Sequence, residues 1–295
     1  MKIFYSPDFV ASAHTFDTTR KAGWIAASLK EKPLAHVEIQ RPRPLSMALL
    51  EHVHDLNYVH AVQMGEPRKL AASQGFIWDP GLWTAAISSC AGAVESALVA
   101  LEEGVAGSLS SGLHHAKHDR GDGFCTFNGL ALAVIAALEK GAKRILIIDA
   151  DAHFGGGTES LVKQHGNKVH HLDVATSIYD AYEPASPHTA DLVGSTEEYL
   201  PLLEKRLLEL DPKFDLCLYN AGMDPHEECF EGGLPGMNAI QLILRENLVF
   251  TWCEGHKIPV AFVTAGGYIG GALDEAGLVD LHRITIRTFA RLSRK

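Results

Sequence analysis

The chain has 295 residues, of which 46% are hydrophobic and 21% are charged, and its 26 basic and 36 acidic side chains give a formal charge of −10. This composition excludes a disordered chain, and the length allows a large buried core. The acidic balance argues against a nucleic-acid binder, which would carry a basic field. We find no apolar run near the ~20 residues of a membrane span and no secretory signal pattern, so we expect no membrane association.

Two residue types bear on compartment and function. The five cysteines are scattered and form no CxxC pair, which fits a reducing compartment better than a disulfide framework. The 16 histidines invite a search for a site, because histidine is the commonest metal ligand and the usual acid or base near neutral pH. We therefore expect a soluble cytoplasmic protein.

Short β-branched runs alternate with longer amphipathic stretches along the chain. The strand candidates are residues 2–5, 34–39, 105–110, 144–149, 168–173, 214–220 and 259–264. The helix candidates are residues 18–30, 82–103, 126–140, 196–210, 238–254 and 274–292. Residues 179–195 contain two prolines and a glycine and are expected to form a loop. The alternation predicts an α/β fold, with one domain over residues 1–295 and a mainly parallel sheet flanked by helices.

Polar side chains follow four of the predicted strands at their carboxyl ends, which is where open α/β sheets bind ligands. Glycines lie beside them and let a ligand approach the backbone. In chain order these side chains are His114 and His115, then Asp149, Asp151 and His153, then Asp224, and finally Tyr268. Four such strand ends are unlikely to converge by chance, so we expect one site there.

Three of these residues have the character of metal ligands. Asp151 and His153 are two positions apart in an extended segment, so their side chains point the same way. Asp224, from another strand end, would complete an Asp-His-Asp set. Three nitrogen and oxygen ligands with one open position are typical of catalytic Zn²⁺, and oxygen-rich ligation also admits Fe²⁺. An aspartate after a strand is often just a helix cap, so the prediction depends on the three residues together.

The remaining residues suit acid–base chemistry beside a metal. His114 and His115 would serve as a general base and its electrostatic partner. Asp149 would orient one of them by accepting its Nδ1–H, as in a catalytic triad. Tyr268, after two glycines, would donate its hydroxyl to a developing oxyanion. Each of these residues alone also fits a packed or solvated side chain.

Five motifs together resemble, in order and spacing, the zinc-dependent histone deacetylase superfamily, including its bacterial amidohydrolases and acetylpolyamine amidohydrolases. They are GLHHA at 112–116, GFCTFN at 123–128, IDADAH at 148–153, AGMDPH at 221–226 and GGY at 266–268. The resemblance covers about residues 6–292 and implies a single-domain arginase–deacetylase fold. It also implies zinc-dependent hydrolysis of an acyl amide, most simply the deacylation of acyl-lysine side chains in proteins or peptides.

Roles follow from the resemblance residue by residue. The Zn²⁺ ligands would be Asp151, His153 and Asp224. His115 would be the general base, with His114 as its partner oriented by Asp149, and Tyr268 would polarise the acyl carbonyl. The implied substrate-binding residues are Gly123, Phe124, Gly266, Gly267 and Asp79. Arg20 is a weaker match to an arginine that the family places below the metal.

The sequence departs from the family pattern at three informative positions. Phe154 replaces the histidine that usually follows the metal-binding one. Gly156 replaces the Asp or Asn that supports the second tandem histidine, so His115 either lacks its orienting group or receives it from elsewhere. His171 replaces a serine of the family's structural K⁺ site, which puts K⁺ binding in doubt.

Three alternatives compete with the acyl-lysine interpretation. An arginase-type ureohydrolase would need two Mn²⁺ ions and more bridging carboxylates than these motifs offer. An acetylpolyamine or other small-amide hydrolase would suit the negative charge of the chain. A catalytically weak acyl-lysine-binding protein is suggested by Phe154 and Gly156.

Overall fold

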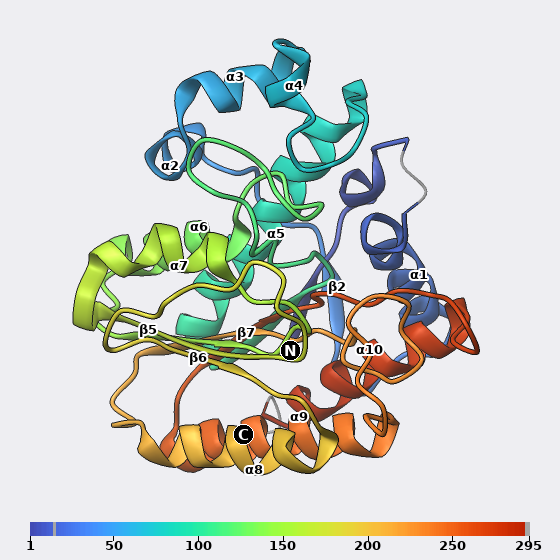
Figure 1. Ribbon diagram of the computed structural model, residues 1–295, viewed down its shortest axis with the longest axis vertical. Helices are drawn as coiled ribbons and strands as arrows, with labels where there is room; N and C mark the ends of the chain where they lie inside the picture. The colour runs from blue at the N-terminus through green and yellow to red at the C-terminus, as the bar shows by residue number, and fades with distance from the viewer. Residues whose placement is uncertain (14–15, 293–295) are drawn as a thin grey trace.

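Eight parallel strands form one sheet in the computed structural model, which describes residues 1–13 and 16–292 (Figure 1). Their order across the sheet is β2-β1-β3-β8-β7-β4-β5-β6. The strands are β1 (Lys2–Phe4), β2 (Glu38–Gln40), β3 (Val105–Ser108), β4 (Ile145–Asp149), β5 (Val169–Ala175), β6 (Thr189–Leu192), β7 (Leu216–Asn220) and β8 (Val260–Val263). Parallel strands need crossover connections, and the helices supply most of them.

The helices cover both faces of this sheet (Figure 1). They are α1 (Asp17–Glu31), α2 (Met47–Val53), α3 (Leu56–Met64), α4 (Arg68–Ala71), α5 (Pro80–Glu103), α6 (Gly129–Glu139), α7 (Gly156–Val162), α8 (Thr196–Glu209), α9 (Ala239–His256) and α10 (Glu275–Phe289). Two short 3₁₀ helices lie at Pro7–Val10 and Lys163–Lys168. The predicted α/β class and parallel sheet are confirmed.

Each central strand contributes to two cores, because side chains alternate along a strand. In β4, Leu146 and Ile148 join the core beneath α1, α8, α9 and α10, whereas Ile145 and Ile147 join the core beneath α2, α3, α5 and α6. All of β4 is buried, as its continuous apolar run predicts.

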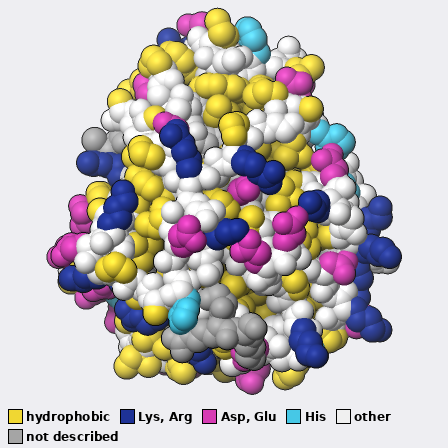
Figure 2. Space-filling model, turned by 180° about the vertical axis from the view of Figure 1, so that it is seen from behind, with side chains coloured by type: hydrophobic (Ala, Val, Ile, Leu, Met, Phe, Trp, Pro, Cys, Tyr) yellow, Lys and Arg dark blue, Asp and Glu magenta, His cyan; other side chains and the backbone are white. Residues whose placement is uncertain are grey.

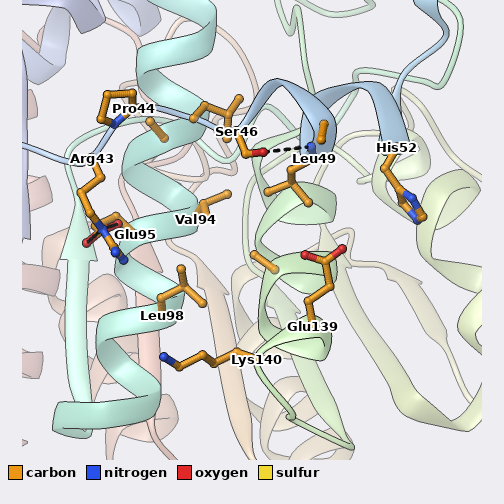
Figure 3. A pocket seen from close by; sticks show the side chains of 14 residues that line it. Arg43, Pro44, Ser46, Leu49, His52, Val94, Glu95, Leu98, Glu139 and Lys140 are labelled. Carbon is orange, nitrogen blue, oxygen red and sulfur yellow. Dashed lines mark hydrogen bonds and ion pairs between the residues drawn. The ribbon is translucent and has the colours of Figure 1, made fainter.

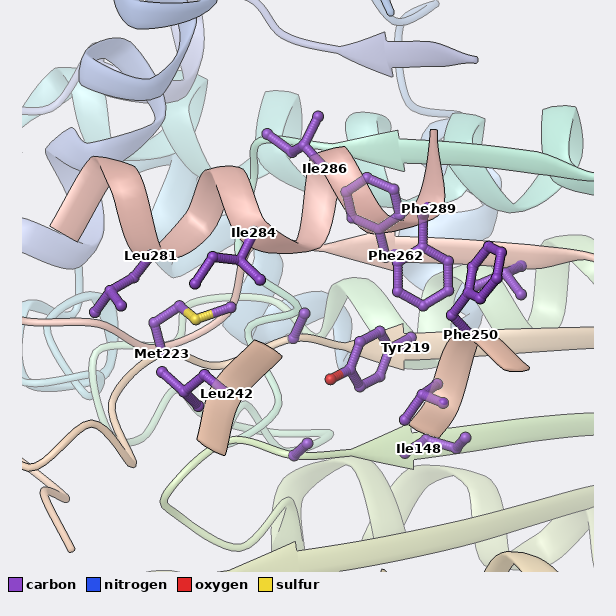
Figure 4. Close-up of a cluster of buried hydrophobic side chains, with 14 of the residues drawn as sticks. Ile148, Tyr219, Met223, Leu242, Phe250, Phe262, Leu281, Ile284, Ile286 and Phe289 are labelled. Atoms are coloured by element: carbon purple, nitrogen blue, oxygen red, sulfur yellow. The ribbon is translucent and has the colours of Figure 1, made fainter. Parts of the chain in front are cut away.

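The core beneath α9 and α10 is rich in aromatic rings (Figure 4). Phe289 of α10 lies 6.1 Å from Phe250 of α9, 5.6 Å from Phe262 of β8 and 5.6 Å from Tyr219 of β7, measured between ring centroids. Edge and tilted contacts of this kind add about 0.5–1.5 kcal/mol per pair beyond burial. The two helices are thereby fixed against the middle of the sheet.

A buried ion pair in the same core reaches the segment after β4. Arg245 donates to Glu246 at 2.7 Å and to the carbonyl oxygen of Ala150 at 3.0 Å. The hydroxyl of Tyr219 donates to the same carboxylate at 2.7 Å. Arg245 therefore fixes the backbone between Asp149 and Asp151.

Parts of the chain differ from the sequence-based expectation. The stretch predicted as a loop, 179–195, contains β6, the third strand on its side of β7. Its residues, Thr-Ala-Asp-Leu, lack a β-branched run, and their burial is partial, because β6 is an edge strand that pairs with β5 alone. The helix expected from 126 begins at Gly129, because Asn128 caps it by accepting the N–H of Ala131.

On the face shown in Figure 2, acidic and basic side chains are interspersed, so the net charge of −10 does not form a field of one sign there.

Helix α5 is long and apolar enough to cross a membrane by length and composition, but more than half of its apolar window is buried within the protein. A core helix of a globular domain passes the same test.

Candidate active site

The carboxyl ends of four neighbouring strands meet at one edge of the sheet. Ser108 of β3 pairs with Val263 of β8, which pairs with Asn220 of β7, which in turn pairs with Asp149 of β4. The segments that follow these strands therefore lie side by side although they are far apart in the sequence. They carry every predicted catalytic and metal-binding residue: His114, His115, Asp149, Asp151, His153, Asp224 and Tyr268.

Asp151, His153 and Asp224 form a buried group whose ligand atoms all lie within 4.8 Å of one another. Nδ1 of His153 is 3.1 Å from Oδ1 of Asp151 and 3.2 Å from Oδ2 of Asp224. Oδ2 of Asp224 is buried and accepts no hydrogen bond from the described residues. Because an unpaired buried carboxylate oxygen is costly, the orphaned atom and the donor set fit a divalent metal ion.

The electrostatics of this group also favour a cation. Burial and the charge of Asp151 raise the pKa of the Asp224 carboxyl to about 7. Burial lowers the pKa of His153, but the hydrogen bond to Asp151 and the charge of Asp224 outweigh it and raise the pKa to about 11. Two adjacent buried carboxylates thus compete for positive charge, which a metal ion would supply.

Gly266 leaves room for the two carboxylates. A Cβ atom on it would lie 2.1 Å from Oδ2 of Asp224 and 2.5 Å from Oδ2 of Asp151. Its N–H donates to Oδ2 of Asp151 at 2.6 Å. The sequence assigned Gly266 and Gly267 to substrate binding. Gly266 lies against Asp151 and Asp224, and a Cβ on Gly267 would lie 2.9 Å from the buried ring of His282.

His114 is held by a carboxylate at the end of a strand. Its Nδ1–H donates to Oδ2 of Asp149 at 2.8 Å, and Asn220 donates to the other oxygen of Asp149 at 2.8 Å. Asp149 is fully buried. Burial lowers the pKa of His114, but the charges of Asp149 and Asp151 outweigh it and raise the pKa to about 10. The carboxylates of Asp149 and Asp151 thus favour the protonated form of His114.

His115 differs from its neighbour in both partner and charge. Its Nδ1 lies 3.0 Å from Oδ2 of Asp180, a residue of the loop before β6 that sequence reasoning did not single out. The rings of His114 and His115 are 4.0 Å apart between centroids. Burial and the positive charge of His114 lower the pKa of His115 to about 4. A neutral imidazole of this kind is available to accept a proton.

A pocket of about 450 Å³ lies against these residues, and His115, His153, Tyr179 and Tyr268 help to line it. Phe124, Tyr179 and Tyr268 give it aromatic rings, beside polar residues such as Ser73, Gln74 and Ser177. The ring of Phe16 packs against two of these rings, 4.5 Å from that of Phe124 and 5.4 Å from that of Tyr268. Gly123 and Phe124 line it, as the sequence predicts. Burial and the charges of Asp224 and Asp151 raise the pKa of Tyr268 well above its usual value, so its hydroxyl stays protonated and can donate.

Residues 14–278 match the family of the histone deacetylase domain. The chain belongs to this family. It is 32% identical over 279 residues to an uncharacterised protein of Picosynechococcus sp., covering 90% of this chain and 91% of that protein. It is 26% identical over 294 residues to histone deacetylase 2 of Arabidopsis thaliana, covering 91% of this chain and 75% of that one.

The fold agrees with this assignment. The structure of acetylpolyamine aminohydrolase from Burkholderia pseudomallei superposes with a TM-score of 0.80 at 18% identity, covering 99% of both chains. The predicted arginase–deacetylase fold is therefore confirmed, and the family match identifies the chain as a hydrolase that acts on amides. It also favours this family over the arginase-type ureohydrolases considered from the sequence.

The position of Gly156 is the most informative departure from the deacetylase pattern. A Cβ atom there would lie 2.3 Å from the carbonyl oxygen of Asp180 and 2.7 Å from Oδ1 of Asp180. The carboxylate missing at Gly156 is thus replaced from another segment, which is one of the two outcomes that the sequence leaves open for His115. Phe154, the other departure nearby, is buried and packs its ring on that of Tyr182 at 6.1 Å.

Two weaker expectations have other outcomes. Asp79 caps α5 by accepting the N–H of Gly81 at 2.8 Å, and it accepts the hydroxyl of Ser12 at 2.7 Å, so the structure gives its carboxylate a helix-capping place outside the pocket. Arg20 is exposed, with its guanidinium over the ring of Trp24. The next residue, Lys21, is buried instead, and burial lowers the pKa of its amine to about 8 against the charges of Asp151 and Asp224.

A second buried polar cluster lies beneath Asp149 at the expected K⁺ position. Nε2 of His171 is 3.9 Å from Oδ2 of Asp149 and 3.9 Å from Oδ2 of Asp173, and its Nδ1 is 3.7 Å from Oε2 of Glu159. Glu159 also pairs with buried His188. Burial lowers the pKa of His171, but the nearby acidic groups Asp149, Glu159 and Asp173 outweigh it and raise the pKa to about 9. The surrounding acidic groups thus favour the protonated form of His171, and the same crowding of negative charge raises the pKa of Asp173 to about 7.

The largest groove described lies elsewhere, between α2, α5 and α6 (Figure 3). It has a volume of about 650 Å³ and an apolar floor that includes Leu49, Val94 and Leu98. Two of its rim charges, Arg43 and Glu95, are ion-paired with each other at 2.9 Å. The tandem histidines, the three acid and histidine ligands and Tyr268 all lie away from it, so the smaller pocket is the candidate active site.

Proposed function

We propose that the chain is a zinc-dependent deacylase that removes short acyl groups from the ε-amine of lysine side chains in proteins or peptides. The observation that carries the proposal is the pocket lined by the rings of Phe124, Tyr179 and Tyr268 together with His115 and His153, beside the buried candidate ligand group. Such walls suit the methylene chain of a lysine, and the polar end suits hydrolysis of its amide.

Each side chain has a chemical role in this proposal. A zinc ion held by Asp151, His153 and Asp224 would polarise the acyl carbonyl and lower the pKa of water. His115, which is neutral, takes the proton of the attacking water. Tyr268 donates its hydroxyl to the acyl oxygen as negative charge develops there. His114, kept protonated by Asp149, supplies the proton for the leaving amine.

The test is a panel of acyl-lysine peptides of rising acyl length, assayed for free amine with Zn²⁺, with Fe²⁺ and after metal removal. We expect hydrolysis with a metal and loss of at least about two orders of magnitude without it, because the metal carries much of the charge stabilisation. Equal rates for metal-free and metal-loaded protein would contradict the proposal. The acyl length that gives the highest kcat/KM reports the depth of the pocket.

A small cationic amide is the second candidate, and two carboxylates in the pocket lining favour it. Asp122 and Glu231 both line the pocket, and Glu231 is exposed. A positively charged acylated amine, such as an acetylated polyamine, would gain from them. Acetylputrescine hydrolysed with a higher kcat/KM than an acetyl-lysine peptide, together with a loss of that preference in Glu231→Gln, would favour this candidate.

The hypothesis of a catalytically weak acyl-lysine binder rests on Phe154 and on the missing side chain at Gly156. The contact of Asp180 with His115 argues for turnover instead. Calorimetric binding of an acyl-lysine peptide without any released amine would reverse this preference.

A further inference from the structure

The loop between β5 and β6 brings a carboxylate to the tandem histidines. Oδ2 of Asp180 accepts from Nδ1 of His115 at 3.0 Å and from the N–H of Gly157 at 3.0 Å. Oδ1 of Asp180 lies 3.0 Å from Nζ of Lys117. Both oxygens therefore have donors, and the side chain of Asp180 is only 6% exposed. A carboxylate held by several donors in this way has one orientation.

The backbone of this loop suits an aspartate. Asp180 has φ of 57°, in the left-handed region, which Asp and Asn adopt more readily than other residues with a side chain. Its neighbour Tyr179 contacts the pocket: the ring lies 5.0 Å from that of His115, and the hydroxyl donates to Asp122 at 2.7 Å. Tyr179 therefore packs against the ring of His115, while Asp180 accepts a hydrogen bond from its Nδ1.

Gly156 and Asp180 exclude each other's side chains. The 2.3 Å between a Cβ at 156 and the carbonyl oxygen of Asp180 is far shorter than any real contact, so residue 156 must be glycine while the loop stands as it does. Only glycine at position 156 therefore leaves room for Asp180, a carboxylate from outside the motif, to support His115.

We propose that Asp180 is the positioning residue of His115 in the deacylation proposed above. By accepting Nδ1–H it holds the imidazole in the tautomer whose Nε2 is unprotonated, and Lys117 and Gly157 hold the carboxylate in place. Removing it leaves His115 free to rotate or to carry its proton on Nε2, where it cannot act as a base. The kinetic test of this inference rests on the proposed function, whereas the measurement of the His115 tautomer does not.

The kinetic test compares Asp180→Asn and Asp180→Ala with Asp191→Asn, all loaded with Zn²⁺. Asp191 is a matched control, because it lies in the same connection between β5 and α8 and pairs with Arg206 at 2.6 Å, outside the pocket. We expect kcat to fall about 10- to 100-fold in Asp180→Ala with KM changed less than about threefold, as for other groups that orient a catalytic imidazole, and to fall less in Asp180→Asn, whose amide oxygen can still accept Nδ1–H. The control should keep the wild-type kcat. Wild-type kcat in both Asp180 variants would overturn the inference.

A second measurement needs no substrate. In zinc-loaded protein labelled with ¹⁵N at histidine, the His115 signals, assigned from their loss in His115→Asn, should show the Nδ1-protonated tautomer. Asp180→Ala should move the signals toward the other tautomer or exchange broadening. An unchanged tautomer would contradict the inference even if the enzyme is active. An inactive wild type whose tautomer shifts in Asp180→Ala would instead contradict the proposed function and support the positioning.

Discussion

His114 and His115 are adjacent in the chain, but their carboxylate partners come from different kinds of structure. Asp149 ends a central strand, is fully buried and is held by Asn220 of the neighbouring strand. Asp180 lies in a loop and is held by Lys117, whose side chain is 22% exposed. A strand-end partner is fixed by the sheet, whereas a loop partner is fixed by a few polar contacts.

The difference in setting has an electrostatic consequence. The strand-end couple carries the positive charge, because Asp149 and Asp151 both face His114. The loop couple does not, because burial and the charge of His114 act on His115 together. One histidine is thus a proton donor and its neighbour a proton acceptor, and the predictions below test whether their supports differ in the same way.

The largest effect is expected from removing the strand-end carboxylate. Asp149→Ala removes the carboxylate that pairs with buried His114 and accepts from the Asn220 amide, which costs about 3–5 kcal/mol for a broken buried pair. Urea unfolding should show this loss, together with nearly complete loss of activity. Asp180→Ala should cost clearly less stability. Equal losses of unfolding free energy in the two variants would remove the contrast between the couples.

Tyr268 contacts neither Asp149 nor Asp180, so its substitution tests the chemical step without changing the support of the two histidines. Tyr268→Phe should lower kcat by about two to three orders of magnitude, because it removes one donor to the acyl oxygen. Its unfolding free energy should stay near that of the wild type, since the ring remains. A kcat within fivefold of wild type would show that Tyr268 does not stabilise the oxyanion.

The strand-end half of the site could be predicted from the sequence, and the loop half could not. Asp151, His153, Asp224 and Asp149 follow apolar runs that are recognisable as strands, and parallel strands bring their carboxyl ends together. The parallel order of the strands therefore brings these residues together in space. No comparable rule places a residue such as Asp180, in a stretch expected to be a loop, beside a histidine 65 positions away.

Other misses have related causes. Lys21 lies one residue from the predicted Arg20, but which side of α1 is buried depends on packing against α10. The edge strand β6 has little apolar character of its own and forms because β5 offers a free edge. Gly156 showed in the sequence that the usual supporting side chain is missing. This observation could have prompted a search for a replacement carboxylate, but it does not indicate where in the chain that carboxylate lies.

The cluster beneath Asp149 gives a prediction on pH. The folded-state pKa of His171 is raised to about 9, so its contribution to stability is complete below pH about 6.5 and is lost as the pH rises through 9. The difference in unfolding free energy between wild type and His171→Gln should therefore shrink by up to about 3 kcal/mol over this interval. A difference independent of pH would contradict a charged His171.

We also expect equal activity in K⁺ and Na⁺ buffers, because His171 supplies the positive charge.

The mutual exclusion at Gly156 offers a way to disturb the loop couple alone. Gly156→Ala should push the Asp180 loop away, at a cost of about 1–3 kcal/mol for overpacking, and should lower kcat as the Asp180 variants do. Gly194→Ala is the matched control, because no atom lies within 4 Å of a Cβ there. If Gly156→Ala keeps the wild-type kcat and the Nδ1 tautomer of His115, the loop has accommodated the methyl group and the exclusion does not control the base.

The smallest effect is expected from the support of the loop carboxylate. Lys117→Gln removes the 3.0 Å ion pair with Asp180 and the 2.9 Å ion pair with Asp122, but Gly157 and His115 still hold Oδ2 of Asp180. Partly exposed ion pairs contribute about 0–1 kcal/mol, so kcat/KM should fall less than tenfold, and added salt should reduce the difference from wild type. Lys205→Gln, in an exposed ion pair of α8, is the control and should not alter kcat/KM. A loss as large as that of Asp180→Asn, insensitive to salt, would mean that Lys117 fixes the carboxylate by geometry, as Asn220 does for Asp149, and the two couples would then be supported alike.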